Sequence, residues 1–433
     1  MGMDISRSSY TDASFKEVLD TVRSIEGLSR HPGVHAAGIV ITPGPVEDYA
    51  PVQVAKDGSL VTQYTMNDVS AVGILKMDFL GLRTLTVVEQ CLRMIKQNHG
   101  VPDDFDIDAI PERDKKTFSL LQSGQCAGVF QLESSGMQSL VIDIRPESID
   151  DIIPLVALYR PGPMEQGITE SFVRRRHGDE AIAYLHDSLR PILGNTYGLI
   201  VYQDQILKIC LDVAGMTPLG ADNVLRAMGK KKQDKMDAQK PEFISGAIEK
   251  SGFDEEQAET LWNMMAEFAK YGFNRNHAAA YAMLSYQTAW LKAHYPIEFM
   301  AALMTSVADN KDKVVIYIDE CRRMGLSVHP PDVNRSVANF TVDGNGIRFG
   351  LMAINGIGEK PIQAIIDARS EGPFVDMFDF CMRVNIRQCH VSTRPSTTAA
   401  KSMGKITSPA FVGTEHRRPT GRPNILHNSK GTK

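Results

Sequence analysis

The chain has 433 residues, of which 43% are hydrophobic and 23% charged, and its formal net charge is −5. This is the composition of an ordinary globular protein, and the length favours about two to four domains. No apolar run approaches the roughly 20 residues that span a bilayer. The N-terminus has no apolar signal-peptide core, and the six scattered cysteines have no Cys-x-x-Cys or zinc-ligand spacing. We therefore expect a cytoplasmic protein without a membrane segment.

The first thirty residues have helical periodicity, which begins at Asp12 or Ser14 as the cap. A β-branched run, residues 37–42, follows and ends at a Pro-Gly-Pro sequence. Just before that run, residues 29–38 crowd Arg30, His31 and His35 among small residues that would let a backbone approach a ligand closely. Spacing alone favours a basic loop with a tight turn.

Residues 75–82 read Leu-Lys-Met-Asp-Phe-Leu-Gly-Leu and set two opposite charges inside an apolar run. Because side chains alternate along a strand, Lys76 and Asp78 are expected to share one face, with Met77 and Phe79 on the other. A buried carboxylate without a partner is costly. A carboxylate flanked by a lysine on a buried strand suits a site that holds a metal and an anionic substrate.

From Arg83 to about Ala308 the apolar spacing predicts mostly helices, and the clearest are 85–97, 254–269 and 277–292. The sequence Val-His-Pro-Pro-Asp at 328–332 breaks this pattern, and residues 340–351 predict a short hairpin. The fold class expected is α+β and predominantly helical, with a small mixed β-sheet near the front.

Basic side chains mark three places in the helical region. Residues 159–163 predict a rigid, non-helical corner that presents Arg160, and the arginines at 174–176 are expected to end a helix and to be solvated. Residues 226–232, Arg-Ala-Met-Gly-Lys-Lys-Lys, end a helix at a glycine and gather positive charge. Such a run either neutralises phosphates or forms a solvated face.

Two further segments place polar groups at turns. Residues 271–281 open a helix for which Asn276 is a plausible N-cap, and Asn274, Arg275 and His277 could form an anion site there or have a structural role. Residues 354–364 have the rhythm of a helix-hairpin-helix turn. In such a turn two glycines, here Gly356 and Gly358, let backbone N–H groups reach a DNA phosphate.

From Ile386 onward the chain has nine basic residues against one acid, with many Ser, Thr, Pro and Gly residues. Such a segment buries too little apolar surface to offset its ordering entropy, so residues 386–433 are expected to be a disordered basic tail. It could touch nucleic acid, although most such tails are simply solvated.

Seven motifs, in this order, resemble the α subunits of bacterial DNA polymerase III, the C-family replicative polymerases. They are residues 30–38, 77–84, 128–133, 158–164, 226–231, 271–274 and 285–296. The resemblance runs from about Ile25 to Val384. It implies the end of a thumb-like helical segment (1–29), the C-terminal part of a palm (30–84), fingers (85–335) and the start of a helix-hairpin-helix and clamp-binding region (336–385).

The resemblance implies template-directed addition of deoxynucleotides to a primer 3′ end. The family's palm uses three aspartates and two Mg²⁺ ions, which clamp the attacking and leaving oxygens. By motif, Asp78 corresponds to the third aspartate, as catalytic residue and metal ligand, and Lys76 would lie beside the triphosphate. The implied nucleotide- or DNA-phosphate-binding residues are Arg30, His31, Arg160, Arg226, Lys230, Lys231, Asn274, His277, Gly356 and Gly358.

The implied partners are primer-template DNA, deoxynucleoside triphosphates, other replicase subunits and the sliding clamp. The sequence also departs from the family. No Asp-x-Asp precedes Arg30, and the Asp-Phe-Asp-Ile-Asp run at 104–108 follows Asp78, so we reject it as catalytic. Leu225-Arg226 stands where the family tends to have two arginines.

The family's N-terminal phosphatase-like domain and its clamp-binding and oligonucleotide-binding domains are not recognised, and the tail suggests a truncated or shifted reading frame. The chain is therefore expected to be a piece of the polymerase. The alternative is a non-catalytic fragment that binds DNA or nucleotide but cannot polymerise. An unrelated metal hydrolase would need a ligand cluster that the sequence does not contain.

Overall fold

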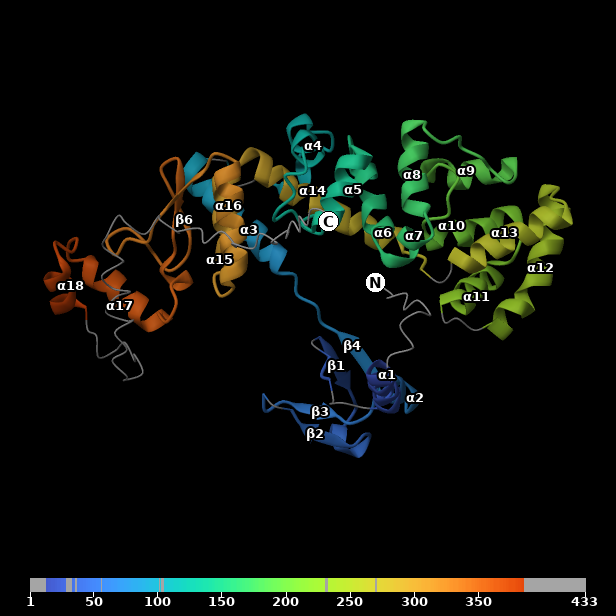
Figure 1. Cartoon of the computed structure of the whole chain (residues 1–433), viewed down its shortest axis with the longest axis horizontal. Coiled ribbons are helices and arrows are strands. Elements are labelled where there is room, and N and C mark those ends of the chain that lie inside the picture. Colours follow the sequence, from blue (N-terminus) through green and yellow to red (C-terminus); the bar gives the residue numbers. More distant parts are fainter. Residues whose placement is uncertain are drawn as a thin grey trace, which may run out of the picture. The chain divides into compact units, whose positions relative to one another are not determined.

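The fold is taken from a computed structural model that describes residues 13–28, 33–35, 37–55, 57–100, 102, 105–229, 233–268 and 271–384. The chain divides into two compact units, Met1–Leu82 and Arg83–Lys433 (Figure 1). Arg30, His31, Lys230, Lys231 and the tail 386–433, all named in the sequence analysis, lie outside the described residues.

Among its described residues, the first unit contains two α-helices and two antiparallel ribbons. Strand β1 pairs with β4, and β2 pairs with β3. The elements are α1 (Ala13–Ile25), β1 (Gly38–Ile41), β2 (Val52–Val54), β3 (Leu60–Thr62), α2 (Met66–Ala71) and β4 (Leu75–Asp78). Thr65 and Asp68 form a capping box at the start of α2. Ala50, Val69 and Ile74 form a small core, with Val40 packed against it.

One face of the β1–β4 ribbon is apolar and exposed. The cross-strand pairs are Ile39 with Met77 and Ile41 with Leu75, and these four side chains are 44–56% exposed. The expectation that residues 75–78 form a strand is confirmed, but the expectation that this strand is buried is wrong. Burial depends on what covers a ribbon, and among the described residues nothing covers this face.

Because exposed apolar strands associate with one another, we expect the chain to self-associate at micromolar concentration. Replacing Ile39 and Met77 together with threonine should shift sedimentation-velocity profiles toward the monomer. The matched control is threonine at Val54 and Leu60, an exposed cross-strand pair on the β2–β3 ribbon, which should have a smaller effect. A wild-type chain that sediments as one monodisperse monomer would contradict this prediction.

The second unit is predominantly helical, as the sequence predicts. Its longer helices are α3 (Arg83–His99), α4 (Lys115–Gln122), α5 (Ser135–Ile144), α6 (Ile149–Leu158), α8 (Ile168–His177), α11 (Pro218–Gly229), α12 (Gln233–Ser251), α13 (Glu255–Phe268), α14 (Arg275–His294), α15 (Pro296–Ser306), α16 (Lys311–Arg323) and α17 (Glu359–Arg369). The shorter helices are α7 (Pro161–Glu165), α9 (Arg190–Leu193), α10 (Gln203–Lys208) and α18 (Met377–Arg383). A π-helical segment, Ile209–Val213, extends α10. The predicted helices 85–97, 254–269 and 277–292 agree with α3, α13 and α14.

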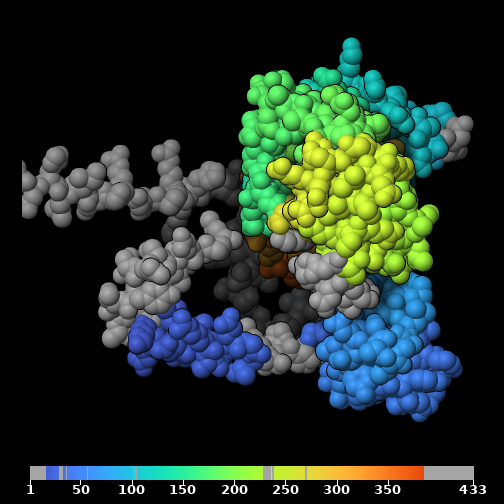
Figure 2. Space-filling model, turned by 90° about the vertical axis from the view of Figure 1, so that its right-hand side faces the viewer, coloured from blue at the N-terminus to red at the C-terminus, as the bar shows by residue number. Residues whose placement is uncertain are grey.

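Helix α14 is the central helix of this unit, and most of its residues from Ala282 to Ala293 are buried. It packs against α4, α6 and α15, while α3 packs along α15 (Figure 1). A second core lies among α10, the π-helical segment and α11–α13. These last three helices pack into one continuous surface, seen in the space-filling view (Figure 2).

A three-stranded sheet follows α16, in the order β5–β7–β6. Its strands are β5 (Ser327–His329), β6 (Thr341–Asp343) and β7 (Gly346–Arg348). The β6–β7 hairpin confirms the sequence prediction, whereas the parallel partner β5 was not predicted because parallel pairing is not a local signal. The expected fold class, α+β and predominantly helical, is confirmed. The mixed sheet lies here, after α16, and not near the start of the chain, where both ribbons are antiparallel.

Candidate functional site

Lys76 and Asp78 form an ion pair on the side of β4 opposite the exposed apolar face. The Lys76 Nζ lies 2.5 Å from Asp78 Oδ1, and the two side chains are 17% and 46% exposed. The hydrogen bond from Lys76 holds the pKa of the Asp78 carboxyl below its usual value. Asp78 is therefore ionised at neutral pH and reaches solvent, and it is not part of a closed core.

The strand opposite makes room for this pair. Gly38 faces Asp78 across the ribbon, and a Cβ there would lie 2.7 Å from Lys76 Cε and 3.0 Å from His35 Nδ1. The His35 Nδ1 is also 3.8 Å from Asp78 Oδ1. His35 is thus the histidine that the described structure brings to Asp78. The small residues before β1 are the sequence feature that could have predicted this approach.

The carboxylate suits a hard divalent cation such as Mg²⁺, which prefers oxygen ligands. Within the described ranges, however, no group of three or more His, Cys, Asp or Glu side chains is arranged to hold a metal. One carboxylate, already paired with a lysine, cannot position two divalent ions. The described residues therefore offer one ligand and do not by themselves fit a two-metal site.

The run at 104–108 has a local structural role in the part that the structure describes. Asp106 caps a short 3-10 helix by accepting the N–H of Asp108 at 2.8 Å, and Asp108 accepts a hydrogen bond from Gln287 at 2.6 Å. Both carboxylates belong to the second unit and help to fix the loop before α4. These contacts agree with the rejection of this run as catalytic.

Arg160 is placed differently from the expectation. It is the N-cap of α7, so the corner after Tyr159 is helical from Pro161 onward. Its Nε donates to the Ala157 carbonyl at 2.9 Å and its Nη2 to the Tyr271 carbonyl at 2.6 Å, and its guanidinium lies 4.6 Å from the centre of the Phe273 ring. Burial lowers the pKa of this half-buried arginine. Its donors therefore hold two backbone segments together.

Asn274, and not Asn276, caps helix α14. The Asn274 Oδ1 accepts the His277 N–H at 3.2 Å. The His277 ring is exposed and lies between Phe273 and Tyr281, with centroid distances of 5.5 Å and 4.2 Å. Because Arg160 lies over Phe273, the structure brings three of the predicted site residues together at this helix start.

The arginines at the end of α8 are not simply solvated, which corrects the expectation. Arg175 Nε lies 2.7 Å from Glu180 Oε1, and Arg176 pairs with Asp151; both guanidinium groups are only 16% exposed. The pKa of Glu180 is lowered to about 2, chiefly by the hydrogen bond from Arg175. These side chains stabilise the packing of α8.

The remaining predicted residues lie apart from that helix start. Arg226, in the last turn of α11, is 72% exposed and pairs with Asp222 of the same helix at 2.6 Å. Gly356 has a φ of +81° in the turn before α17, and Gly358 is the N-cap of that helix. A Cβ at either glycine would meet no atom within 4 Å, so the backbone of this turn is open to a ligand.

The segment that contains the turn at Gly356 indicates the class of protein. Residues 325–403 match a helix-hairpin-helix motif, a module that binds nucleic acid through backbone contacts to phosphates. The match extends past Val384, where the family resemblance was expected to end.

Two further matches identify the family. Residues 3–81 match the NTPase domain of the bacterial DNA polymerase III alpha subunit, and residues 84–251 match its finger domain. The chain is 47% identical over 407 residues to the DNA polymerase III subunit alpha of Pasteurella multocida, covering 92% of this chain and 35% of that protein. It is 47% identical over 388 residues to the same subunit of Escherichia coli K12, covering 87% and 33%. It is 48% identical over 379 residues to that of Thermus aquaticus, covering 86% and 31%.

The chain belongs to the family of bacterial DNA polymerase III alpha subunits. It spans about a third of the length of the curated relatives that it matches. None of the helices within the described residues combines the length and apolar character needed to cross a membrane.

Proposed function

We propose that this chain forms part of a DNA-directed DNA polymerase that adds deoxynucleotides to a primer 3′ end in the cytoplasm. In this proposal residues 30–84 belong to the palm, 85–335 to the fingers, and the segment after 336 begins the helix-hairpin-helix and clamp-binding region. The Lys76–Asp78 pair is the observation that carries the proposal. An ionised carboxylate that reaches solvent beside a lysine is suited to a cation and an anionic substrate, and it lies in a segment that matches the family.

The proposed roles follow from the chemistry of the two side chains. Asp78 would provide one oxygen ligand of the two Mg²⁺ ions that the family resemblance implies, with further carboxylates required. Lys76 holds Asp78 in place and, two residues away on the same strand face, would face the triphosphate of a nucleotide bound there. Arg226, Lys230, Lys231, Asn274 and His277 would contact DNA or nucleotide phosphates, with Arg30 and His31 near the palm.

The binding half of the proposal is tested with fluorescein-labelled primed DNA and anisotropy at several NaCl concentrations. Replacing Lys230 and Lys231 together with glutamate should weaken binding about tenfold or more, because two phosphate contacts are lost. The slope of log K against log salt should fall by about 0.9 for each contact. The control is glutamate at Lys115 and Lys116, an exposed adjacent pair at the start of α4. Equal losses in the two double variants would contradict a specific role for Lys230 and Lys231.

A second candidate function is DNA or nucleotide binding without polymerisation. It is favoured by the single carboxylate of the candidate site, because one such group cannot position two divalent ions. We expect no primer extension by this polypeptide alone in the presence of Mg²⁺ and all four deoxynucleoside triphosphates. Robust synthesis that Asp78→Ala abolishes would overturn this expectation and assign catalysis to the chain itself.

A further inference from the structure

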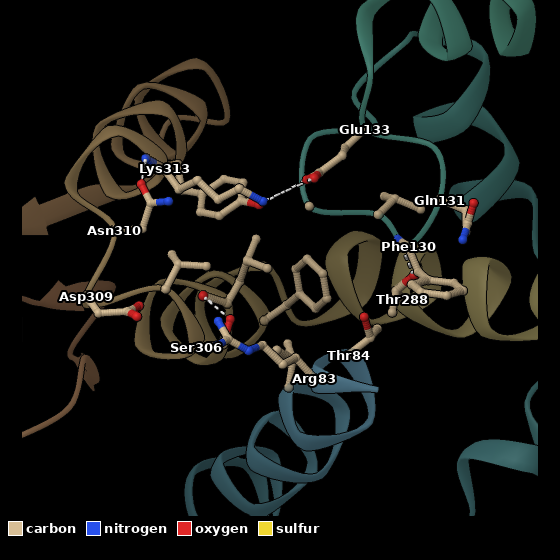
Figure 3. A pocket seen from close by; sticks show the side chains of 17 residues that line it. Arg83, Thr84, Phe130, Gln131, Glu133, Thr288, Ser306, Asp309, Asn310 and Lys313 are labelled. Atoms are coloured by element: carbon tan, nitrogen blue, oxygen red, sulfur yellow. Dashed lines mark hydrogen bonds and ion pairs between the residues drawn. The ribbon is translucent and has the colours of Figure 1, made fainter. Parts of the chain in front are cut away.

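A pocket of about 280 Å³ lies in the second unit, and none of the site residues assigned above lines it. Its walls come from the first turn of α3, the loop 128–133, the C-terminal half of α15 and the first two turns of α16 (Figure 3). Although this volume is near the lower end for ligand sites, it has room for one small molecule.

The floor of the pocket is apolar. It is made by the buried side chains of Val87, Val129, Phe299, Leu303 and Val307. Val87 lies on α3, and Phe299 and Leu303 lie on α15, two helices that pack against each other, so this part of the floor belongs to the packed core. An occupant would gain from placing a ring or an aliphatic group there, at about 25 cal/mol for each Å² of apolar surface removed from water.

The rim carries charged side chains, and only some of them have a hydrogen-bond or ion-pair partner. Lys313 Nζ lies 3.6 Å from Glu133 Oε1 across the mouth, and the Tyr317 hydroxyl donates to Glu133 Oε2 at 2.9 Å (Figure 3). Glu133 is thus already compensated. The Arg83 guanidinium, in contrast, is exposed to water and forms no hydrogen bond or ion pair with any residue in the part of the chain described, although it lines the same pocket.

The helix termini at the pocket add to this positive character. Helix α3 begins at Arg83, and α16 begins at Lys311 after Asn310, whose side chain caps the N–H of Lys313. The positive ends of both helix dipoles therefore lie at the rim. The opposing carboxylate is Asp309, which is exposed to water at the edge, as Arg83 is, so solvent screens both charges.

We propose that this pocket binds a small amphipathic anion, in which an apolar ring lies on the floor and a carboxylate or phosphate pairs with Arg83. The bidentate fork of arginine suits either group. Arg83 is the first residue of the second unit and follows Asp78 by five positions in the sequence.

The test uses the full chain, with 2-naphthoate and 2-naphthyl phosphate as probes and neutral 2-naphthylmethanol as comparison, in ligand-observed NMR titrations. Both anions should bind about tenfold more tightly than the alcohol, which corresponds to about 1.4 kcal/mol, because only they can pair with the guanidinium. Their ratio shows whether carboxylate or phosphate is preferred. Arg83→Gln should remove this advantage, whereas Arg93→Gln, an exposed arginine two to three turns along α3, should keep it.

A pocket-filling variant separates this site from the exposed apolar ribbon of the first unit. Ser306→Phe places a ring in the pocket and should abolish anion binding while the circular-dichroism melting curve remains cooperative. The proposal is overturned if the alcohol binds as well as the anions, if Arg83→Gln behaves as Arg93→Gln, or if a folded Ser306→Phe variant binds as wild type. None of these readouts depends on polymerase activity.

Discussion

Replacing Lys292 with methionine is expected to lower the free energy of unfolding of the second unit by about 3–5 kcal/mol. The Lys292 side chain is fully buried in α14. Its Nζ donates to Glu320 Oε1 at 2.6 Å and to the carbonyls of Gln125 and Ala127, each at 2.8 Å. Methionine fills similar space but donates no hydrogen bond, so two carbonyls would lose this donor and the buried Glu320 would keep only its ion pair with Arg323, at 3.2 Å.

The chain allows a clean measurement of this effect. Its two tryptophans, Trp262 and Trp290, both belong to the second unit and are buried, so urea unfolding followed by tryptophan fluorescence reports that unit. Arg322→Met removes the exposed ion pair with Asp319 on the same helix as Glu320 and should cost less than about 0.5 kcal/mol. Lys292→Met combined with Glu320→Leu should recover part of the loss, because it removes the buried carboxylate that would otherwise pair only with the exposed Arg323. If the Lys292 and Arg322 variants lose equal stability, the buried pair does not hold this core together.

Lys292 also shows which features of the fold could not be predicted from the sequence. The 3.6-residue periodicity is a local signal, and it was sufficient to predict helix 277–292. The burial of Lys292 depends on the Gln125 and Ala127 carbonyls, more than 160 positions earlier, and no local pattern carries that information. The same reason explains why strand β5 was missed while the β6–β7 hairpin was predicted.

The candidate site, too, could be predicted from the sequence only in part. The period of two along a strand was sufficient to place Lys76 and Asp78 on one face, and the ion pair confirms it. The exposure of the strand was not predictable, because it depends on what packs against the ribbon. Asn274 and Asn276 are equally good capping residues by type. Asn274 is the cap because its backbone is extended, with φ −77° and ψ 118°, just before the helix begins.

Arg160→Lys is expected to lower the free energy of unfolding by about 2–4 kcal/mol, although it conserves the charge. An ammonium group cannot donate to the Ala157 and Tyr271 carbonyls and also lie flat over Phe273, as the guanidinium does. Hydrogen bonds from a charged donor contribute about 1.5–3 kcal/mol each, and the cation–π contact about 0.5–2 kcal/mol. The measurement is again urea unfolding followed by tryptophan fluorescence. Arg190→Lys is the matched control, because Arg190 also lies over a ring, that of Tyr184, but is exposed, and its replacement should leave stability close to wild type.

DNA binding by variants at position 160 shows whether Arg160 has a structural role or binds a phosphate. If Arg160 holds the turn that carries Asn274 and His277, then Arg160→Met will weaken binding of primed DNA only in proportion to the loss of folded protein. The slope of log K against log salt will then remain that of the wild type. If Arg160 contacts a phosphate, as the family resemblance implied, that slope will fall by about 0.9 in the methionine variant, and the lysine variant will retain it. A reduced slope in a fully folded Arg160→Met protein would therefore show that Arg160 contributes a phosphate contact in addition to its bonds to the two carbonyls.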